Sequence, residues 1–240
     1  MVSPMQRRRM RLDAERKAKS AGVQASNTAS DNNQKSGSST NAWDLVRSTI
    51  DADIKQLKKI KPLAQKIEYK QKVIENYQPY LTRSDIPVDI KMLLMVWLFD
   101  IGKIGDAITI CIDAIEKGYK MPDFIKSSSP EFLADTVFDW SEKQFKAGHS
   151  AAPYFDQVFK LVTEKFNTYE VIKAKYYKLA GLMALGKHGA HPRHVSEPER
   201  LKTALAMFTK ADQIYDRAGV GTRIAEINKR LAILMIDHND

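Results

Sequence analysis

The chain has 240 residues, of which 43% are hydrophobic, and its formal net charge is +9. This length and hydrophobic content suit one folded domain with a tail, and they exclude a chain too polar to form a core. Because the sequence has no run of about 18 consecutive apolar residues, we expect no membrane-spanning helix and no membrane partner. The single cysteine, Cys111, cannot form an internal disulfide, which fits a reducing cytoplasm.

Positive charge is concentrated in the first third of the sequence. Residues 1–40 contain eight Lys or Arg against three acids, and residues 41–81 contain eight against five. The remaining residues therefore contribute only +1 of the total of +9. This distribution favours a polyanion such as DNA as a partner, although a solvated tail that keeps the protein soluble would have the same balance.

Residues 1–40 are predicted to form a disordered basic arm and linker. Residues 20–40 are mostly Ser, Asn, Ala, Gly, Thr and Gln, so they offer too little apolar surface to fold. The first residues are charged rather than apolar after the arginines, which does not fit a secretory signal peptide. We expect the basic residues of the arm to contact DNA phosphates: Arg7, Arg8, Arg9, Arg11, Arg16, Lys17 and Lys19.

Residues 41–81 are predicted to form a coiled-coil-like helical segment that begins at Asn41, a plausible N-cap. Apolar residues recur there at seven-residue spacing, with Asp53 interrupting one of the two series. Pro62 lies within the pattern and predicts a kink, or two helices that meet near Lys61. The expected oligomerisation seam consists of Ile50, Leu57, Ile60, Ile67 and Ile74. Packing of this seam within the monomer is the alternative.

Lysines also recur along this segment. Four of them fall within roughly 60° of one face of a straight helix, namely Lys55, Lys59, Lys66 and Lys70. A lysine stripe of this kind can follow a phosphate backbone, so the four are predicted to bind DNA; a solvated coiled-coil face is the bland alternative. A second array borders the seam, namely Lys58, Lys61 and Lys72, and interhelical charge pairs are the alternative to DNA binding for these three.

Residues 82–240 are predicted to form an α-helical hairpin domain, which makes the whole fold all-α. The expected helices are 88–101, 106–117, 130–147, 152–166, 169–185, 197–218 and 222–236, with Gly102 and Gly105 in one turn and Gly118 ending a helix. Small residues at the spacing of tetratricopeptide-like hairpins occur twice, as Ala107, Cys111, Ala114 and as Ala204, Phe208, Ala211. The flanking Ile110 and Ile112 predict that Cys111 is buried and unreactive.

Motifs for catalysis are weak, and we expect no catalytic residue, no metal and no cofactor. His188, His191 and His194 recur every third residue, but Pro192 and the neighbouring glycines favour an exposed loop over a zinc site. Glu68-Tyr69-Lys70 has half of a common nuclease signature without the preceding Pro-Asp on a strand. The sequence also has no phosphate-binding loop of the Walker type.

The start of the chain and its centre resemble one known family. The first residues run Met-Val-Ser-Pro-Met-Gln-Arg-Arg-Arg-Met-Arg, similar to the opening of the terminase small subunit of peduovirus-type temperate tailed phages. The apolar helix with Trp97, the Asp100-x-Gly102 turn and the alanine-containing helix at Ala107 resemble the same family, as does the segment 118–122, Gly-Tyr-Lys-Met-Pro. The resemblance covers the first eleven residues and most of the chain from Trp43.

The resemblance implies a function in the cytoplasm of the bacterial host. A small terminase subunit binds the packaging-start (cos) region of concatemeric double-stranded phage DNA and recruits the large ATPase–nuclease subunit. It also implies a homo-oligomer, often a ring. The family is labelled an endonuclease subunit, so a subunit that itself cuts DNA is one alternative; a DNA-independent helical scaffold is another. The resemblance leaves open whether the basic arm contacts DNA or the large subunit.

Overall fold

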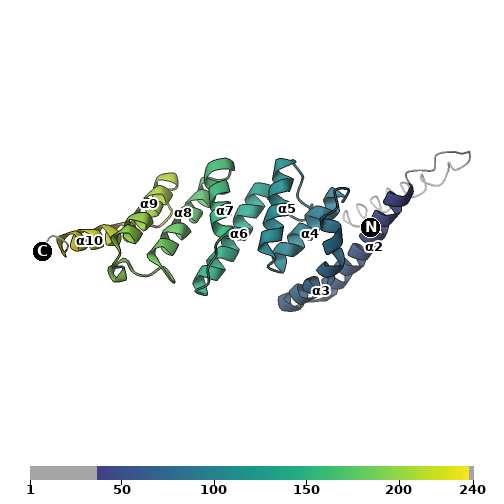
Figure 1. The fold of residues 1–240 in the computed structure, drawn as a ribbon, viewed down its shortest axis with the longest axis horizontal. Coiled ribbons are helices and arrows are strands. Elements are labelled where there is room, and N and C mark those ends of the chain that lie inside the picture. The colour runs from purple at the N-terminus through teal and green to yellow at the C-terminus, as the bar shows by residue number, and fades with distance from the viewer. Residues whose placement is uncertain (1–36, 238–240) are drawn as a thin grey trace, which may run out of the picture. The chain divides into compact units, whose positions relative to one another are not determined.

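A computed structural model describes residues 37–237, and the side chains of residues 42–235. Within this part of the chain every regular element is helical and no strand occurs, which confirms the all-α prediction (Figure 1). The α-helices are α2 (Gly37–Lys59), α3 (Leu63–Leu81), α4 (Val88–Asp100), α5 (Ile104–Glu116), α6 (Ser129–Lys146), α7 (Tyr154–Lys160), α8 (Glu170–Leu185), α9 (Pro198–Ile214) and α10 (Gly221–Asp237). A π-helical turn, Leu161–Lys165, extends α7, and a 3-10 turn, Pro192–His194, precedes α9.

The chain divides into two compact units, Met1–Asp44 and Leu45–Asp240. Residues 1–36 of the predicted basic arm and linker lie outside the described residues, and residues 37–40, which were predicted to be disordered, belong to α2. In the second unit, helices that follow one another along the chain pack as neighbours, including α3 with α4, α4 with α5, α5 with α6, α6 with α7 and α8 with α9. None of the helices in residues 37–237 is long and apolar enough to cross a membrane.

Pro62 separates two helices rather than bending one. α2 ends at Lys59 and α3 begins at Leu63, so residues 60–62 are not helical. Proline disfavours the helical conformation of the residue before it, and its ring clashes with the preceding turn. Two helices meeting near Lys61 was one of the two predicted outcomes. The predicted start at Asn41 is wrong, because α2 already begins at Gly37 and Asn41 lies inside it.

Asp53, the acid that interrupts the apolar series, joins α2 to α3. Its carboxylate accepts hydrogen bonds from the hydroxyls of Tyr69, at 2.7 Å, and Tyr77, at 2.5 Å. The bond to Asp53, followed by burial, raises the pKa of Tyr69 to about 12. The pKa of Tyr77 is raised mainly by burial and then by Asp53. Asp53 interrupts the apolar series, but its carboxylate receives hydrogen bonds from two tyrosines of α3 and is therefore not left without partners.

The helix α4 is the most buried element, as its apolar sequence predicts. Eight of its residues are buried, and the last three of them, Trp97, Leu98 and Phe99, point to different sides. Trp97 is only 3% exposed, and the edge of its ring meets Tyr77 of α3 at a centroid distance of 6.1 Å. Such a helix must be covered on all sides, which α3 and α5 help to do.

Close packing of small residues builds the helical hairpins. Ala107, Cys111 and Ala114 of α5 are completely buried. In the pair α8 and α9, a Cβ atom at Gly181 would lie 2.7 Å from the ring of Phe208, so only glycine permits this approach. The predicted small-residue pattern therefore corresponds to real helix contacts. Gly105 likewise permits a close approach, because a Cβ atom there would lie 2.9 Å from the hydroxyl of Tyr154. Gly105 was predicted to lie in the α4–α5 turn, but of the two glycines only Gly102 has a positive φ.

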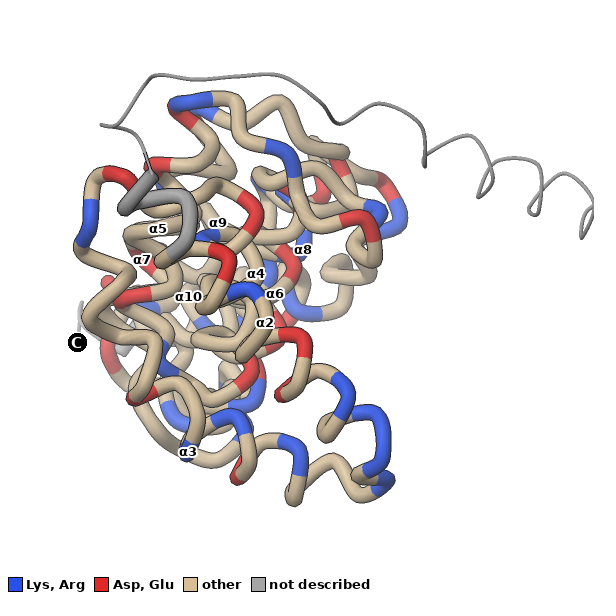
Figure 2. The backbone as a smooth tube through the Cα atoms, turned by 90° about the vertical axis from the view of Figure 1, so that its right-hand side faces the viewer, with Lys and Arg blue, Asp and Glu red and all other residues tan. Residues whose placement is uncertain are grey.

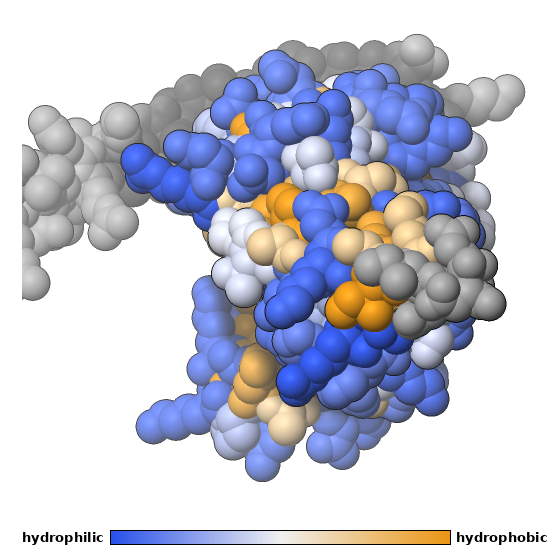
Figure 3. All heavy atoms as spheres, turned by 90° about the vertical axis from the view of Figure 1, so that its left-hand side faces the viewer, coloured by the Kyte–Doolittle hydropathy of each residue, from blue (hydrophilic) through white to orange (hydrophobic). Residues whose placement is uncertain are grey.

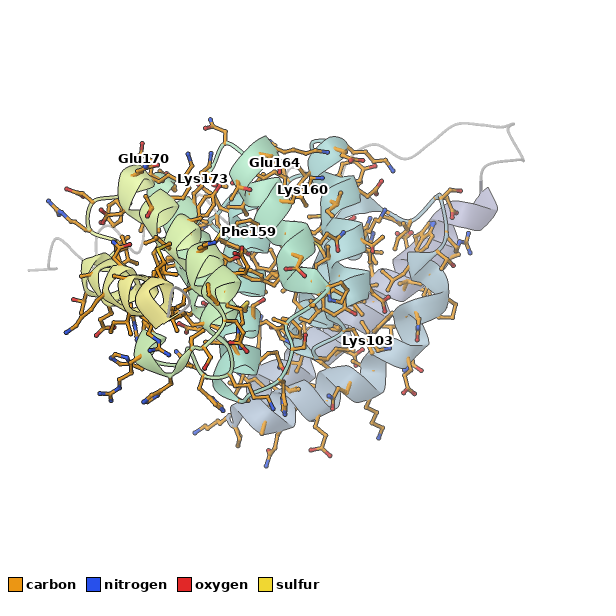
Figure 4. The ribbon with its side chains drawn as sticks, turned by 60° about the vertical axis from the view of Figure 1, so that its left-hand side comes forward. Lys103, Phe159, Lys160, Glu164, Glu170 and Lys173 are labelled. Carbon is orange, nitrogen blue, oxygen red and sulfur yellow. The ribbon has the colours of Figure 1, made fainter. Side chains whose placement is uncertain are left out.

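Aromatic side chains hold α6, α7 and α8 together. Phe155 of α7 stacks on Tyr176 of α8 with ring centroids 5.4 Å apart, and the Tyr176 hydroxyl donates to the carbonyl of Ala134 in α6 at 2.7 Å. Phe159 meets the edge of Tyr177 at 5.1 Å and points between the helices (Figure 4). These contacts make the middle of the second unit a continuous core.

The buried thiol of Cys111 gives the first testable prediction. The side chain is fully buried, and burial raises its pKa to about 12. At pH 8 only about one thiol in ten thousand would be ionised, and the thiolate is the reactive form. We expect no reaction with a disulfide reagent over an hour in the native protein and complete reaction in denaturant. Rapid stoichiometric labelling of the folded protein would contradict the buried position.

Candidate nucleic-acid interface

Five exposed lysines lie on the last turns of α2, in the break after it and on α3, and we call this set the lysine elbow. Lys55, Lys58 and Lys59 lie in the last turns of α2, Lys61 lies in the break, and Lys72 lies near the middle of α3. No carboxylate of the described residues is within ion-pair distance of any of the five. Figure 2 shows Lys and Arg recurring along the tube around α3. Exposed ammonium groups without such a partner can approach a polyanion without first breaking a salt bridge.

The predicted stripe of four lysines on one helix face is wrong. It assumed a straight helix through residues 55–70, whereas the break at 60–62 places Lys55 and Lys59 on α2 and Lys66 and Lys70 on α3. Lys66 and Lys70 are half-buried and line a groove beside α6. The ammonium of Lys70 is paired with Asp100 and lies 5.9 Å from the centre of the Trp97 ring. Lys70 is therefore a packing residue in this structure.

The second lysine array, for which interhelical charge pairs were the alternative, is part of the elbow. Lys58, Lys61 and Lys72 are exposed and face no carboxylate of a neighbouring helix within the described part of the chain. Acids lie close by, because Asp51 is exposed one turn before Lys55 on α2, and Glu68 and Glu75 are exposed within one turn of Lys72 on α3. The elbow therefore has a positive balance but is not free of acids.

The predicted oligomerisation seam is largely covered by the chain itself. Ile50 is 4%, Leu57 is 9% and Ile74 is 1% exposed, while Ile60 and Ile67 are half-buried. Side chains that are already buried cannot also cover a second copy. Ile50, Leu57 and Ile74 therefore pack within the monomer, which was the alternative to an oligomerisation seam.

Carboxylates that might suggest metal chemistry are engaged in structural contacts. Asp113 of α5 pairs with Lys117 at 2.6 Å and with Lys91 at 2.7 Å, and these bonds, with Lys117 first, lower its pKa. In the Glu68-Tyr69-Lys70 segment, Tyr69 is bound to Asp53 and Lys70 to Asp100. Across the described residues, no three His, Cys, Asp or Glu side chains gather as a metal site would require.

The predicted histidine loop connects α8 to α9. His191 is 3.2 Å from Glu226 of α10, and Arg193 donates to His194 at 3.2 Å. The rings of His191 and His194 are 6.0 Å apart, and His188 has a positive φ of 57°. His191 and His194 therefore have different polar partners, and His191 links the loop to α10.

Other surfaces of the second unit differ from the elbow in charge or polarity. On the face formed by α7 and α8, Lys160 and Lys173 alternate with Glu164 and Glu170, so opposite charges are interspersed (Figure 4). On the side where α10 lies, hydrophobic atoms appear among hydrophilic ones (Figure 3). Near the end of α10, Ile233 is 41% and Met235 is 60% exposed.

Comparison with known proteins places the chain in a family. Residues 48–170 match the family described as "Phage small terminase subunit". The chain belongs to this family. The match begins within α2 and ends at the start of α8, so it includes the lysine elbow and the groove beside α6. The family resemblance suggested by Trp97 and the segment 118–122 is confirmed, and it assigns the protein a role in phage DNA packaging.

One curated relative matches over most of the chain. A protein of Haemophilus phage HP1 (strain HP1c1), named "Probable terminase, endonuclease subunit", is 29% identical over 204 residues. This alignment covers 81% of the chain and 72% of the relative. No solved structure matches the chain.

Proposed function

We propose that the protein binds the packaging-start (cos) region of concatemeric double-stranded phage DNA and recruits or regulates the large ATPase–nuclease subunit. The observation that carries the DNA-binding part is the lysine elbow, which lies in the segment that matches the small terminase family. Each phosphate that a lysine neutralises releases condensed counterions from the duplex, and that release drives binding. Recruitment of the large subunit rests on family membership.

The lysines supply affinity rather than sequence choice. Contacts to phosphates position a protein on DNA but carry no direct sequence information. Selection of the packaging start therefore depends on base contacts made elsewhere or on the shape and deformability of the DNA. Self-association, as a homo-oligomer or ring, remains part of the proposal and would place several elbows along one duplex.

Titration of labelled duplexes with the purified protein tests the proposal. A duplex containing the packaging start and a scrambled duplex of equal length are compared by fluorescence anisotropy at several salt concentrations. We expect binding to both at low salt, a steep salt dependence and tighter binding to the packaging-start duplex. A footprint with and without the large subunit would then locate the site. No binding even at low salt would favour a DNA-independent scaffold.

A nuclease function is the second candidate, because the relative from phage HP1 carries the words "endonuclease subunit" in its name. Cleavage assisted by two metal ions needs several carboxylates that converge on the ions. Incubation of the purified chain with supercoiled DNA and Mg²⁺ or Mn²⁺ distinguishes the candidates. Under our proposal the DNA stays intact unless the large subunit is added. Metal-dependent nicking by the small subunit alone would establish the nuclease instead.

Deletion of residues 1–20 tests the proposed role of the basic arm in DNA binding. The deletion removes Arg7, Arg8, Arg9, Arg11, Arg16, Lys17 and Lys19. If each makes one phosphate contact, the log–log salt slope becomes shallower by up to about 6, and affinity falls for all sequences alike. Unchanged affinity and slope, together with lost stimulation of the large subunit, would show that the arm binds protein instead.

A further inference from the structure

A groove of about 560 Å³ lies between α3 and α6. Its floor is apolar and is formed by the C-terminal end of α4 and by α6, where the rings of Phe99 and Phe132 meet edge to face with centroids 5.6 Å apart. The inner end is closed by Gly102 and Ile104 at the α4–α5 turn. All these residues belong to the segment that matches the small terminase family.

The two rims of the groove carry large apolar side chains. On the α3 side, Leu63 is 73% exposed, which is high for a leucine. On the α6 side, Trp140 is half-buried and its position is fixed by an edge contact with Tyr154, with centroids 5.6 Å apart. Aromatic and aliphatic side chains around a preformed apolar groove are the usual anchors of a protein interface.

The two rims differ in charge. Lys66 on α3 has no carboxylate partner among the described residues, and Lys70 beside it is already paired with Asp100. Across the groove, Asp135 and Asp139 lie one turn apart on α6. Burial raises the pKa of Asp135; the positive charge of Lys175 opposes this shift, and the acids Asp139 and Glu131 add to it. The α3 side thus presents the cation Lys66, while the α6 side presents the carboxylates of Asp135 and Asp139, with Lys143 one turn beyond them.

We propose that this groove receives an amphipathic helix of the large terminase subunit. That helix would place a stripe of Leu, Ile or Phe on the floor, a basic flank against Asp135 and Asp139, and an acidic flank against Lys66. The inference rests on the proposed recruitment of the large subunit. The walls are helices without a free strand edge, which favours a helix in a groove over an added strand. The carboxylates of α6 would repel the phosphates of DNA.

Lys66 in the groove and Lys72 in the elbow lie on different sides of α3, so a helix and DNA could bind there together. Lys66 in the groove and Lys72 in the elbow are six positions apart on α3, which places them about 120° apart around the helix axis. DNA on the elbow and a helix in the groove would therefore lie on two sides of α3. This arrangement would join the DNA to the packaging motor through a single helix.

Two exposed substitutions test the groove without threatening the core. Leu63→Asp removes the apolar anchor of the α3 rim, and Asp139→Arg reverses a charge of the α6 rim. The matched controls are Leu45→Asp, at a leucine that is 70% exposed on α2, and Asp212→Arg, at an exposed aspartate of α9. Affinity for the purified large subunit is measured by calorimetry on the full chain, and DNA affinity by anisotropy. We expect both groove variants to bind the large subunit at least about tenfold more weakly, with controls and DNA affinity unchanged.

Three other results would overturn the inference in distinguishable ways. Groove variants that bind the large subunit as tightly as the unmodified protein would reject the groove but leave the proposed function intact. Absence of large-subunit binding by the unmodified protein, with or without DNA, would reject both. If the variants lowered the mass of the small-subunit assembly in light scattering while large-subunit binding persisted, the occupant would be a second copy.

Discussion

Replacing Trp97 with alanine is expected to lower the free energy of unfolding by about 3–5 kcal/mol, because the substitution leaves a cavity at the centre of the α3–α4 contact. The indole is 3% exposed, meets the edge of Tyr77 and lies 5.9 Å from the ammonium of Lys70. The loss therefore includes burial of a large ring, an aromatic contact and support for the Lys70–Asp100 pair. Since domains are stabilised by only about 5–15 kcal/mol, a large part of the total stability is lost.

Urea denaturation followed by circular dichroism measures this effect. Val88→Ala on the same helix is the control, because Val88 is 39% exposed and its truncation should cost less than about 1 kcal/mol. Any loss of DNA binding by Trp97→Ala should follow the unfolded fraction. A Trp97→Ala protein with an unchanged denaturation midpoint, or one that is fully folded yet unable to bind DNA, would contradict the structural role.

Local patterns predicted most of the fold because the relevant information is local. The apolar run around Trp97 predicts a helix covered on all sides, and Gly118, with a φ of 67°, ends α5 where expected. The pattern Ala204, Phe208, Ala211 indicated a tight helix pair, and all three residues are completely buried. Helix periodicity and glycine stops depend on neighbours within a few residues, so one sequence suffices to find them.

The arrangement of the lysines could not be predicted in the same way. The predicted stripe was obtained by rotating 100° around one helix axis for each residue from Lys55 to Lys70, which is valid only if the helix is unbroken. Pro62 breaks the helix, and the angle between α2 and α3 is then set by tertiary contacts. One such contact joins Asp53 to the hydroxyls of Tyr69 and Tyr77. The pairing of Lys70 with Asp100 spans 30 residues of sequence. Neither contact leaves a periodic signal.

The groove was not predicted for a related reason. Its rims belong to α3 and α6, which are separated by two helices in the sequence. The sequence indicates only the acidic side of the groove, because four acids of α6 recur at three- to four-residue spacing, namely Glu131, Asp135, Asp139 and Glu142. That spacing indicates an acidic helix face, but only the fold shows that Leu63 and Lys66 stand opposite to it.

Neutralising three lysines of the elbow is expected to weaken DNA binding by up to about 500-fold at 0.1 M salt. The variant carries Lys55→Gln, Lys58→Gln and Lys59→Gln, which remove three exposed charges from the end of α2. Glutamine has nearly the helix propensity of lysine, so the helix should persist. If each lysine neutralises one phosphate, three lost contacts make the log–log salt slope shallower by about 2.7, from which the figure of about 500-fold follows. The loss should be equal for packaging-start and scrambled duplexes, because phosphate contacts carry no sequence information.

A second variant with the same change in net charge separates local contact from general attraction. Lys165→Gln, Lys187→Gln and Lys210→Gln remove three exposed lysines from positions beyond the elbow. Long-range attraction is screened beyond about 10 Å at 0.1 M salt, so this control should lose less than about threefold in affinity and keep its salt slope. Anisotropy titrations at four or more salt concentrations give the slope for each protein. Equal losses in the two variants would show that net charge alone matters, and an elbow variant that binds like the unmodified protein would remove the elbow from the DNA interface.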